Sequence, residues 1–228
     1  TCAGAVTIPI NNYNLVPYIG HYMHFEDFYI GEDGKLSLDF WVMDYNLSKA
    51  KSKFLAETPK MLKCFEHWFG PYPFYEDGFK LVESPHLGME HQSAIAYGNG
   101  YQNGYRGRDL SDTGVGLKWD FILVHESGHE WFGNNISTKD IADMWVHESF
   151  TNYSETLYTG CEVGEEFATT YNVGCRALIG NLEPIIGTYD VNHEGSGDMY
   201  YKGGSMLHTM RAVIDDDEKF RQILRGLD

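Results

Sequence analysis

The sequence has no long apolar run and few basic residues, and both absences narrow its possible functions. No apolar run approaches the roughly 20 residues that span a bilayer, so we expect no transmembrane segment. Lys and Arg number 17 against 33 Asp and Glu, which gives a formal net charge of -16. Because this charge repels phosphate backbones, nucleic-acid binding is not expected. Residues 1–4 lack a basic region followed by an apolar stretch, so we expect no uncleaved signal peptide, and the sequence fits a cytoplasmic or an exported protein equally.

The cysteines also lack the spacing of a metal or redox motif. The four cysteines contain no C-x-x-C pair, so a cysteine zinc site is not indicated. Cys64 lies in an apolar helical pattern and is predicted to be a buried thiol. Cys161 and Cys175 could form a disulfide, which the sequence leaves open. With 43% hydrophobic and 22% charged residues, the 228-residue chain has the balance of a soluble globular domain.

Strand patterns come before helix patterns along the chain. Residues 13–45 alternate around the turn-forming residues 31–34, which predicts a β-hairpin. A helix is predicted to begin with Thr58 as its N-cap and Pro59 in its first turn. Strand patterns return within residues 78–97, and a Gly-rich surface loop is expected over residues 98–116. The remaining helices are expected at 117–132, 141–157, 165–179, 204–213 and 218–224. This order indicates an α+β domain.

The strongest chemical signal is a pair of histidines four residues apart on a predicted helix. His125 and His129 lie on one helix face, where two imidazoles can converge on one metal ion. Glu126 is offset by about 100° around the same helix, so it borders the metal without replacing either ligand. A base in that place can take a proton from a water at the metal. The motif therefore predicts a metal-dependent hydrolase.

A third ligand is predicted on the next helix. Two helices joined by a short connection pack antiparallel, so Glu148 near the start of the second can face His129. Glu155 lies two turns further along the same face, beside His125, where it can accept a hydrogen bond from the other imidazole nitrogen. His147 competes with Glu148 as a ligand but points about 100° away. Two imidazoles and one carboxylate indicate zinc, although cobalt or manganese could occupy the same ligands.

Three motifs in the expected order resemble the gluzincin aminopeptidase family, which includes aminopeptidase N and the leukotriene hydrolases. The first is the segment 125–155, in which the second glutamate, Glu148, follows the H-E-x-x-H motif after 18 residues. Residues 88–91 resemble the G-x-M-E-N exopeptidase motif, with His91 in place of the usual asparagine. Residues 200–203 resemble the Y-x-K-G segment. Other matching positions are Trp131, Gly133 and Asn134.

The resemblance implies a thermolysin-like zincin catalytic domain, with a small mixed sheet in its N-terminal part and helices in its C-terminal part. It implies one zinc ion per chain and peptide substrates with a free N-terminus. Glu126 would then be the general base, and Tyr200 would donate a hydrogen bond to the oxyanion. Glu90 would pair with the substrate α-amine.

The resemblance also assigns a substrate-binding strand and a domain plan. The strand from Gly88 to Ala94 would pair with substrate backbone, and Met89 would line the first side-chain pocket. Residues 1–27 resemble the tail of a preceding β-rich domain, and residues 28–228 would be the catalytic domain. The family's N- and C-terminal domains would belong to the parent protein.

Two other functions fit parts of this pattern. A thermolysin-like endopeptidase shares the zinc ligands but needs no residue that binds the substrate amine. A non-catalytic zinc-binding fragment of a larger enzyme needs neither Glu126 nor Tyr200.

Overall fold

A five-stranded mixed sheet occupies the first half of the chain. The structure is a computed structural model that describes residues 6–227, so residues 1–5 and 228 lie outside the described part, including those relevant to a signal peptide. The sheet has the order β1-β2-β3-β5-β4, and β4 forms one edge. The β1–β2 and β4–β5 pairs are antiparallel, whereas β2–β3 and β3–β5 are parallel. The strands are β1 (Tyr22–Gly31), β2 (Gly34–Met43), β3 (Phe79–Glu83), β4 (Gly88–Met89) and β5 (Ile95–Tyr97).

The predicted hairpin is confirmed, with its start at Tyr22 rather than at residue 13. Gly34 closes the turn with a φ of 106°, a conformation that glycine adopts without steric cost. Along β2, side chains alternate between the core and the outer face of the sheet, as period-2 strands require. The predicted domain boundary between residues 27 and 28 falls inside β1, and the assignment of residues 1–27 to a preceding domain stays a prediction.

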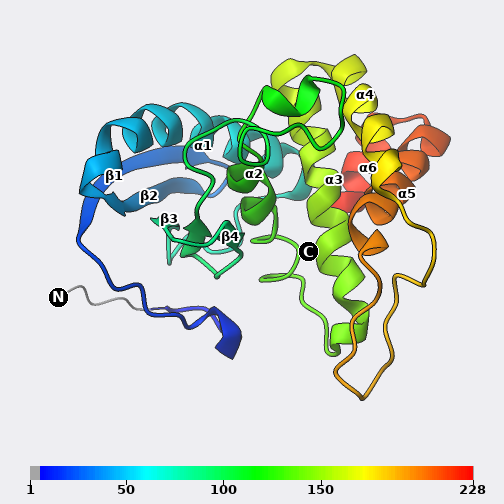
Figure 1. The fold of residues 1–228 in the computed structure, drawn as a ribbon, viewed down its shortest axis with the longest axis horizontal. Coiled ribbons are helices and arrows are strands. Elements are labelled where there is room, and N and C mark those ends of the chain that lie inside the picture. Colours follow the sequence, from blue (N-terminus) through cyan, green and yellow to red (C-terminus); the bar gives the residue numbers. More distant parts are fainter. Residues whose placement is uncertain (1–5, 228) are drawn as a thin grey trace.

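One long helix, α1 (Leu47–Phe69), covers the inner face of the sheet (Figure 1). The expected start at Thr58 was wrong, because Pro59 lies inside this helix rather than in its first turn. Ala50 and Phe54 are fully buried, and the Phe54 ring packs 4.8 Å from that of Tyr97. This burial holds the first turns in helical form, although an interior proline costs about 3 kcal/mol.

The second half of the chain is helical, which confirms the α+β class (Figure 1). α2 begins later than expected, because the Asp120 carboxylate caps it by accepting a hydrogen bond from the Leu123 amide at 3.2 Å, and it ends at Gly128, directly before His129. α5 begins six residues earlier than expected, so it includes Tyr200. The helices are α2 (Phe121–Gly128), α3 (Met144–Val163), α4 (Glu165–Cys175), α5 (Asp198–Ile214) and α6 (Asp217–Arg225). None of them, nor α1, is long and apolar enough to cross a membrane.

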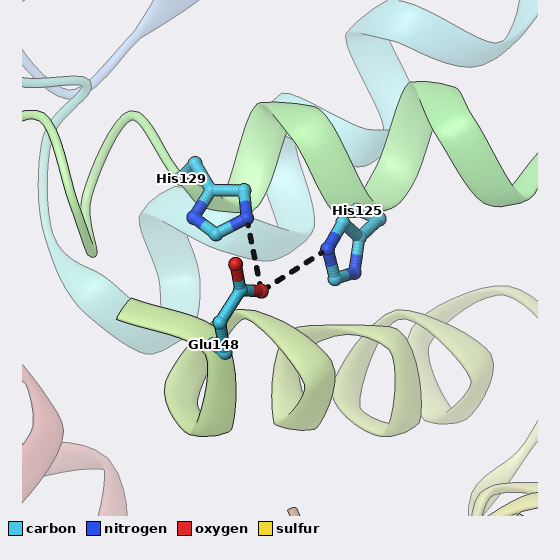
Figure 2. Close-up of side chains that lie close together, drawn as sticks. All are labelled: His125, His129 and Glu148. Carbon is cyan, nitrogen blue, oxygen red and sulfur yellow. Dashed lines mark ion pairs between the residues drawn. The ribbon is translucent and has the colours of Figure 1, made fainter. Parts of the chain in front are cut away.

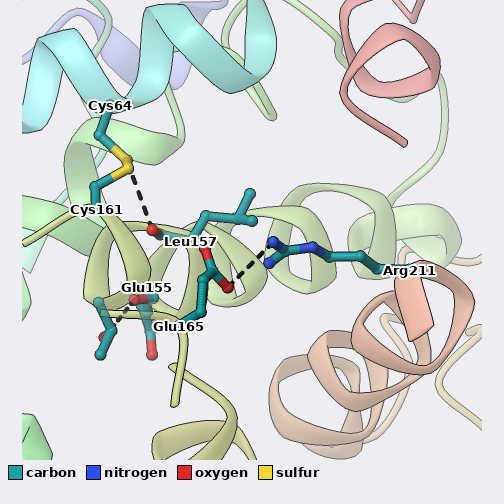
Figure 3. The surroundings of a disulfide bond; sticks show 7 residues. Cys64, Glu155, Leu157, Cys161, Glu165 and Arg211 are labelled. Carbon is teal, nitrogen blue, oxygen red and sulfur yellow. Dashed lines mark hydrogen bonds and ion pairs between the residues drawn. A yellow bond between two sulfur atoms is a disulfide. The ribbon is translucent and has the colours of Figure 1, made fainter. Parts of the chain in front are cut away.

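A disulfide joins α1 to α3 and corrects the expectation for the cysteines (Figure 3). Cys64 bonds Cys161, so Cys64 is not a free thiol and Cys161 does not pair with Cys175. The pairing follows from tertiary packing, because α1 lies against α3 and brings the two Cα atoms within 6.1 Å. Cys175, on α4, is a buried thiol.

We predict that replacing both Cys64 and Cys161 by serine lowers the free energy of unfolding by about 2–5 kcal/mol. The bond closes a long loop, since the two residues are 97 positions apart in sequence. Urea unfolding measures the change, and Cys175→Ala is the control because it removes a thiol without removing a cross-link. An unchanged midpoint in the double variant would contradict the prediction.

Candidate metal centre

The predicted ligands converge between α2 and α3. Both imidazoles project from the α2 segment toward Glu148 on α3 (Figure 2). The Glu148 Oε2 atom lies 3.6 Å from His125 Nε2 and 3.4 Å from His129 Nε2. Antiparallel packing explains the pairing, because Glu148 lies near the start of α3 and His129 directly follows α2. The structure therefore brings the three side chains together as their spacing predicts.

The geometry of these atoms fits a zinc ion. Tetrahedral ligands bound at about 2.0–2.1 Å from zinc lie about 3.3–3.4 Å apart, close to the two separations above. Glu148 Oε2 is buried and has no hydrogen-bond partner among residues 6–227, which is costly for an oxygen unless a cation binds it. Burial opposes ionisation of Glu148, but the positive charge of His129 and the close approach of both imidazole nitrogens hold the pKa of this carboxyl well below its usual value.

Hydrogen bonds at the opposite ring nitrogens orient both imidazoles. His125 Nδ1 lies 2.8 Å from Glu155 Oε1, as predicted from the two-turn spacing. The buried Glu155 carboxylate also accepts hydrogen bonds from Asn152 and from the Tyr171 hydroxyl. His129 Nδ1 lies 3.0 Å from the Phe132 carbonyl oxygen. An Nδ1 that donates leaves Nε2 free to bind a metal, so these contacts favour the required tautomer.

The neighbouring histidine points elsewhere, as expected. His147 Nε2 accepts a hydrogen bond from the Thr138 amide at 3.1 Å. Glu148 is therefore the residue of this pair that faces the imidazoles.

The candidate base borders the metal centre. Carboxylate oxygens of Glu126 and Glu90 and a ring nitrogen of His129 all lie within 4.8 Å of one another. Burial raises the pKa of Glu126 to about 7, against the charges of His125 and His129. A bound divalent cation would lower it again. The Glu126 carboxylate thus lies where it can exchange a proton with a group bound at the metal centre.

The absence of a side chain at Gly88 leaves room for the Glu126 carboxylate. A Cβ atom added at Gly88 would lie 2.5 Å from Glu126 Oε1, far inside van der Waals contact. The glycine of β4 therefore allows the strand to approach α2 closely.

The predicted strand from Gly88 to Ala94 was too long. β4 contains only Gly88 and Met89, and a turn follows in which the Ala94 amide donates to the His91 carbonyl oxygen at 2.9 Å. Met89 is half-buried, and the Glu90 side chain is 9% exposed beside Glu126. Ala94 lies outside any strand, and its carbonyl accepts a hydrogen bond from Tyr18.

Tyr200 lies on the first turn of α5, with its ring centroid 6.2 Å from that of His125. Burial and then the negative charge of Glu148 raise the pKa of the Tyr200 hydroxyl, so it remains a proton donor. Burial raises the pKa of the next tyrosine hydroxyl, that of Tyr201, and the charge of Glu155, rather than that of Glu148, adds to the shift. The structure thus places Tyr200, rather than Tyr201, toward Glu148.

The sequence analysis missed a buried network behind the centre. Glu130 is fully buried and accepts hydrogen bonds from the Ser93 amide, the Tyr72 hydroxyl and Asn134 Nδ2. Asn134 Nδ2 also lies 2.8 Å from the Glu90 carbonyl oxygen. This network ties the Glu90 loop to the end of α2. The only signal for it was the match of Asn134 to the family motif.

Comparisons with known proteins agree with this geometry. The Peptidase family M1 domain model matches residues 54–227. The leukotriene A-4 hydrolase of Xenopus laevis is 26% identical over 186 residues, which cover 75% of this chain and 29% of the relative. Aminopeptidase N of Lactobacillus helveticus is 28% identical over 164 residues, which cover 63% of this chain and 19% of the relative.

Solved structures show the same fold. The M1 zinc metallopeptidase from Deinococcus radiodurans aligns with a TM-score of 0.66 at 20% identity, over 91% of this chain and 43% of the other. Native leukotriene A4 hydrolase from Saccharomyces cerevisiae aligns with a TM-score of 0.66 at 17% identity, over 90% of this chain and 32% of the other. The chain therefore spans less than half the length of these relatives.

We predict that Glu155→Ala weakens zinc binding about 10- to 100-fold, because His125 loses the acceptor that orients its ring. Competition with a chromogenic chelator measures the affinity. Glu162→Ala is the matched control, since Glu162 is an exposed carboxylate at the C-terminal end of α3 that pairs with Lys60. Equal zinc affinity in the two variants would show that Glu155 does not support the ligand.

Proposed function

The chain belongs to peptidase family M1, and from this premise we propose that it is the catalytic part of a zinc-dependent aminopeptidase. The reaction would be hydrolysis of the first peptide bond of peptides with a free N-terminus. The observation that carries the proposal is the position of Glu90, whose carboxylate lies within 4.8 Å of a carboxylate oxygen of Glu126 and a ring nitrogen of His129. An amine-binding group so close to the base limits how far a substrate extends beyond the cleaved bond.

The metal would be held by His125, His129 and Glu148. Three protein ligands of this kind leave a coordination position open, as in catalytic rather than structural zinc sites. When bound, zinc would supply Lewis acidity toward the scissile carbonyl and the attacking water. The zinc metallopeptidases with the same fold support this choice of metal.

Two side chains would move or hold protons during the reaction. Glu126 would accept a proton from the attacking water and then transfer it to the leaving amine. Tyr200 would donate its hydroxyl hydrogen to the carbonyl oxygen as negative charge develops there. The raised pKa of Tyr200 supports this role, since the hydroxyl stays protonated at the pH at which Glu126 works.

Recognition of the substrate would depend on the loop after β4. The Glu90 carboxylate would form a charge-assisted hydrogen bond with the α-ammonium group. Because β4 is the edge of the sheet, Met89 and Gly88 offer backbone groups to an extended peptide. Met89 would border the side chain of the first residue. Ala94 would contribute only through its place in the turn that follows β4.

The relatives support an exopeptidase, since several are named aminopeptidases. Their greater length suggests that the parent protein has further domains that flank this one, and we propose those domains as its partners.

The proposal is tested with L-leucine 4-nitroanilide and its N-acetyl derivative, with and without a chelator. We expect chelator-sensitive hydrolysis of the free amine and no hydrolysis of the blocked substrate. An endopeptidase would instead cleave internal bonds of N-acetylated peptides, and a non-catalytic zinc domain would cleave neither.

We predict that Glu126→Gln lowers kcat by about 10²–10⁴-fold while zinc content is unchanged, because the variant loses the proton acceptor but no ligand.

Glu90→Gln should instead lower kcat/KM for free-amine substrates by roughly 10- to 100-fold, since it removes a charge-assisted hydrogen bond. Steady-state kinetics and metal analysis of both variants check these outcomes. Full efficiency of Glu90→Gln on the free amine would remove the aminopeptidase assignment.

Gly88→Ala should lower kcat by about 100-fold, because the added methyl group displaces the Glu126 carboxylate by about 1 Å or more. Zinc content and thermal stability measured on the same sample separate this effect from misfolding. Gly197→Ala is the matched control, since a Cβ atom there meets no atom within 4 Å. Wild-type turnover of Gly88→Ala would show that Glu126 does not need its observed position.

A further inference from the structure

We propose that Tyr13 is a substrate-binding residue that shares recognition of the free α-amine with Glu90. This inference rests on the proposed aminopeptidase function and adds a residue from a part of the chain outside the three family motifs. The residue belongs to a segment that we call the N-terminal strap, residues 7–18, which precedes β1 and is largely without regular structure.

Side-chain hydrogen bonds anchor the strap to the catalytic loops. The Asn14 side chain is buried, and its Nδ2 atom donates to Asn134 Oδ1 at 3.1 Å. Asn134 in turn holds the Glu90 carbonyl oxygen, so one amide side chain links the strap to the amine-binding loop. Gln92 Nε2 donates to the Pro9 carbonyl oxygen at 3.3 Å. The strap therefore has a defined position against the loop that carries Glu90.

A second anchor involves His91, the residue that stands in place of asparagine in the exopeptidase motif. The Tyr18 hydroxyl lies 2.6 Å from His91 Nδ1 and donates to the Ala94 carbonyl oxygen at 3.1 Å. The two rings also meet edge to face, with centroids 5.9 Å apart. His91 thus holds Tyr18 of the strap against the loop that carries Glu90.

These anchors place the Tyr13 hydroxyl at the candidate amine site. Tyr13 is the central residue of a short 3-10 helix, Asn12–Asn14, and its hydroxyl donates to Glu90 Oε1 at 3.5 Å. The Tyr13 side chain is 40% exposed, whereas Glu90 is 9% exposed, so Tyr13 lies on the solvent side of the carboxylate. Burial, followed by the charge of Glu90, raises the pKa of Tyr13, which keeps its hydroxyl protonated.

The chemistry of an ammonium group suits this pair. Its three hydrogens need several acceptors, and the Glu90 carboxylate and the Tyr13 oxygen provide them side by side. The Tyr13 hydrogen is directed to Glu90, so the lone pairs of its oxygen are available to the amine. An acetylated amine has one hydrogen and no charge, and it adds bulk where Tyr13 stands. Tyr13 should therefore increase the preference for a free N-terminus.

The test compares binding of L-leucine hydroxamate and N-acetyl-L-leucine hydroxamate to the zinc-loaded chain by calorimetry. We expect Tyr13→Phe to weaken binding of the free-amine probe about 3- to 10-fold and to leave the blocked probe unchanged, as loss of one hydrogen bond predicts. On L-leucine 4-nitroanilide, KM should rise while kcat is kept. Tyr45→Phe is the matched control, because it removes the hydroxyl of a tyrosine that is 78% exposed.

The possible outcomes separate this inference from the proposed function. If the wild-type chain prefers the free amine and Tyr13→Phe keeps that preference, the role of Tyr13 is wrong and the proposed function stands. If Tyr13→Phe weakens both probes equally, Tyr13 shapes the cleft without recognising the amine, which also overturns the inference. If the wild-type chain shows no preference for the free-amine probe over the blocked probe, both the aminopeptidase proposal and the role of Tyr13 fail.

Discussion

The placement of one buried carboxylate oxygen between two imidazoles is the constraint on which the rest of the site depends. Glu148 Oε2 faces His125 and His129 and has no hydrogen-bond partner among the described residues. An ionised oxygen in such a place is stable only beside positive charge. The antiparallel pair α2 and α3 provides the geometry, and the Glu155 carboxylate fixes one imidazole from behind. A cation at this point therefore stabilises the fold as well as the proposed reaction.

Buried negative charge also dominates the part of the site around Glu90, where we propose that the substrate amine binds. Glu90 and Glu126 bring two carboxylates into a small, largely buried volume. Burial, and to a smaller extent the negative charges of Glu90 and Glu148, raises the pKa of Glu126. A metal ion and a substrate ammonium group are the two cations that we propose bind there. In this view, the proposed preference for a free N-terminus and the proposed need for a metal would have one electrostatic cause.

Hydrogen bonds behind the site make it a single unit. Asn134 connects the end of α2, the Glu90 loop and the N-terminal strap through its amide group. A different contact, the close approach of Gly88 in β4, determines the position of the Glu126 carboxylate. The positions of metal ligands, base and amine site are thus coupled through packing between the sheet edge and α2. A side chain displaced at any one of these contacts would therefore shift the residues at the others.

Much of this could be predicted because its causes are local. The i,i+4 spacing of His125 and His129 and the two-turn spacing from Glu148 to Glu155 fix which side chains share a helix face. The order of strand and helix patterns likewise determined the α+β class. Tertiary structure decided the rest: α1 continues through Pro59 because its first turns are buried, and Cys64 bonds Cys161 because α1 lies against α3. Tyr13 approaches Glu90 across 77 residues of sequence, a contact that no local pattern encodes, because only the folded chain brings the strap to the cleft.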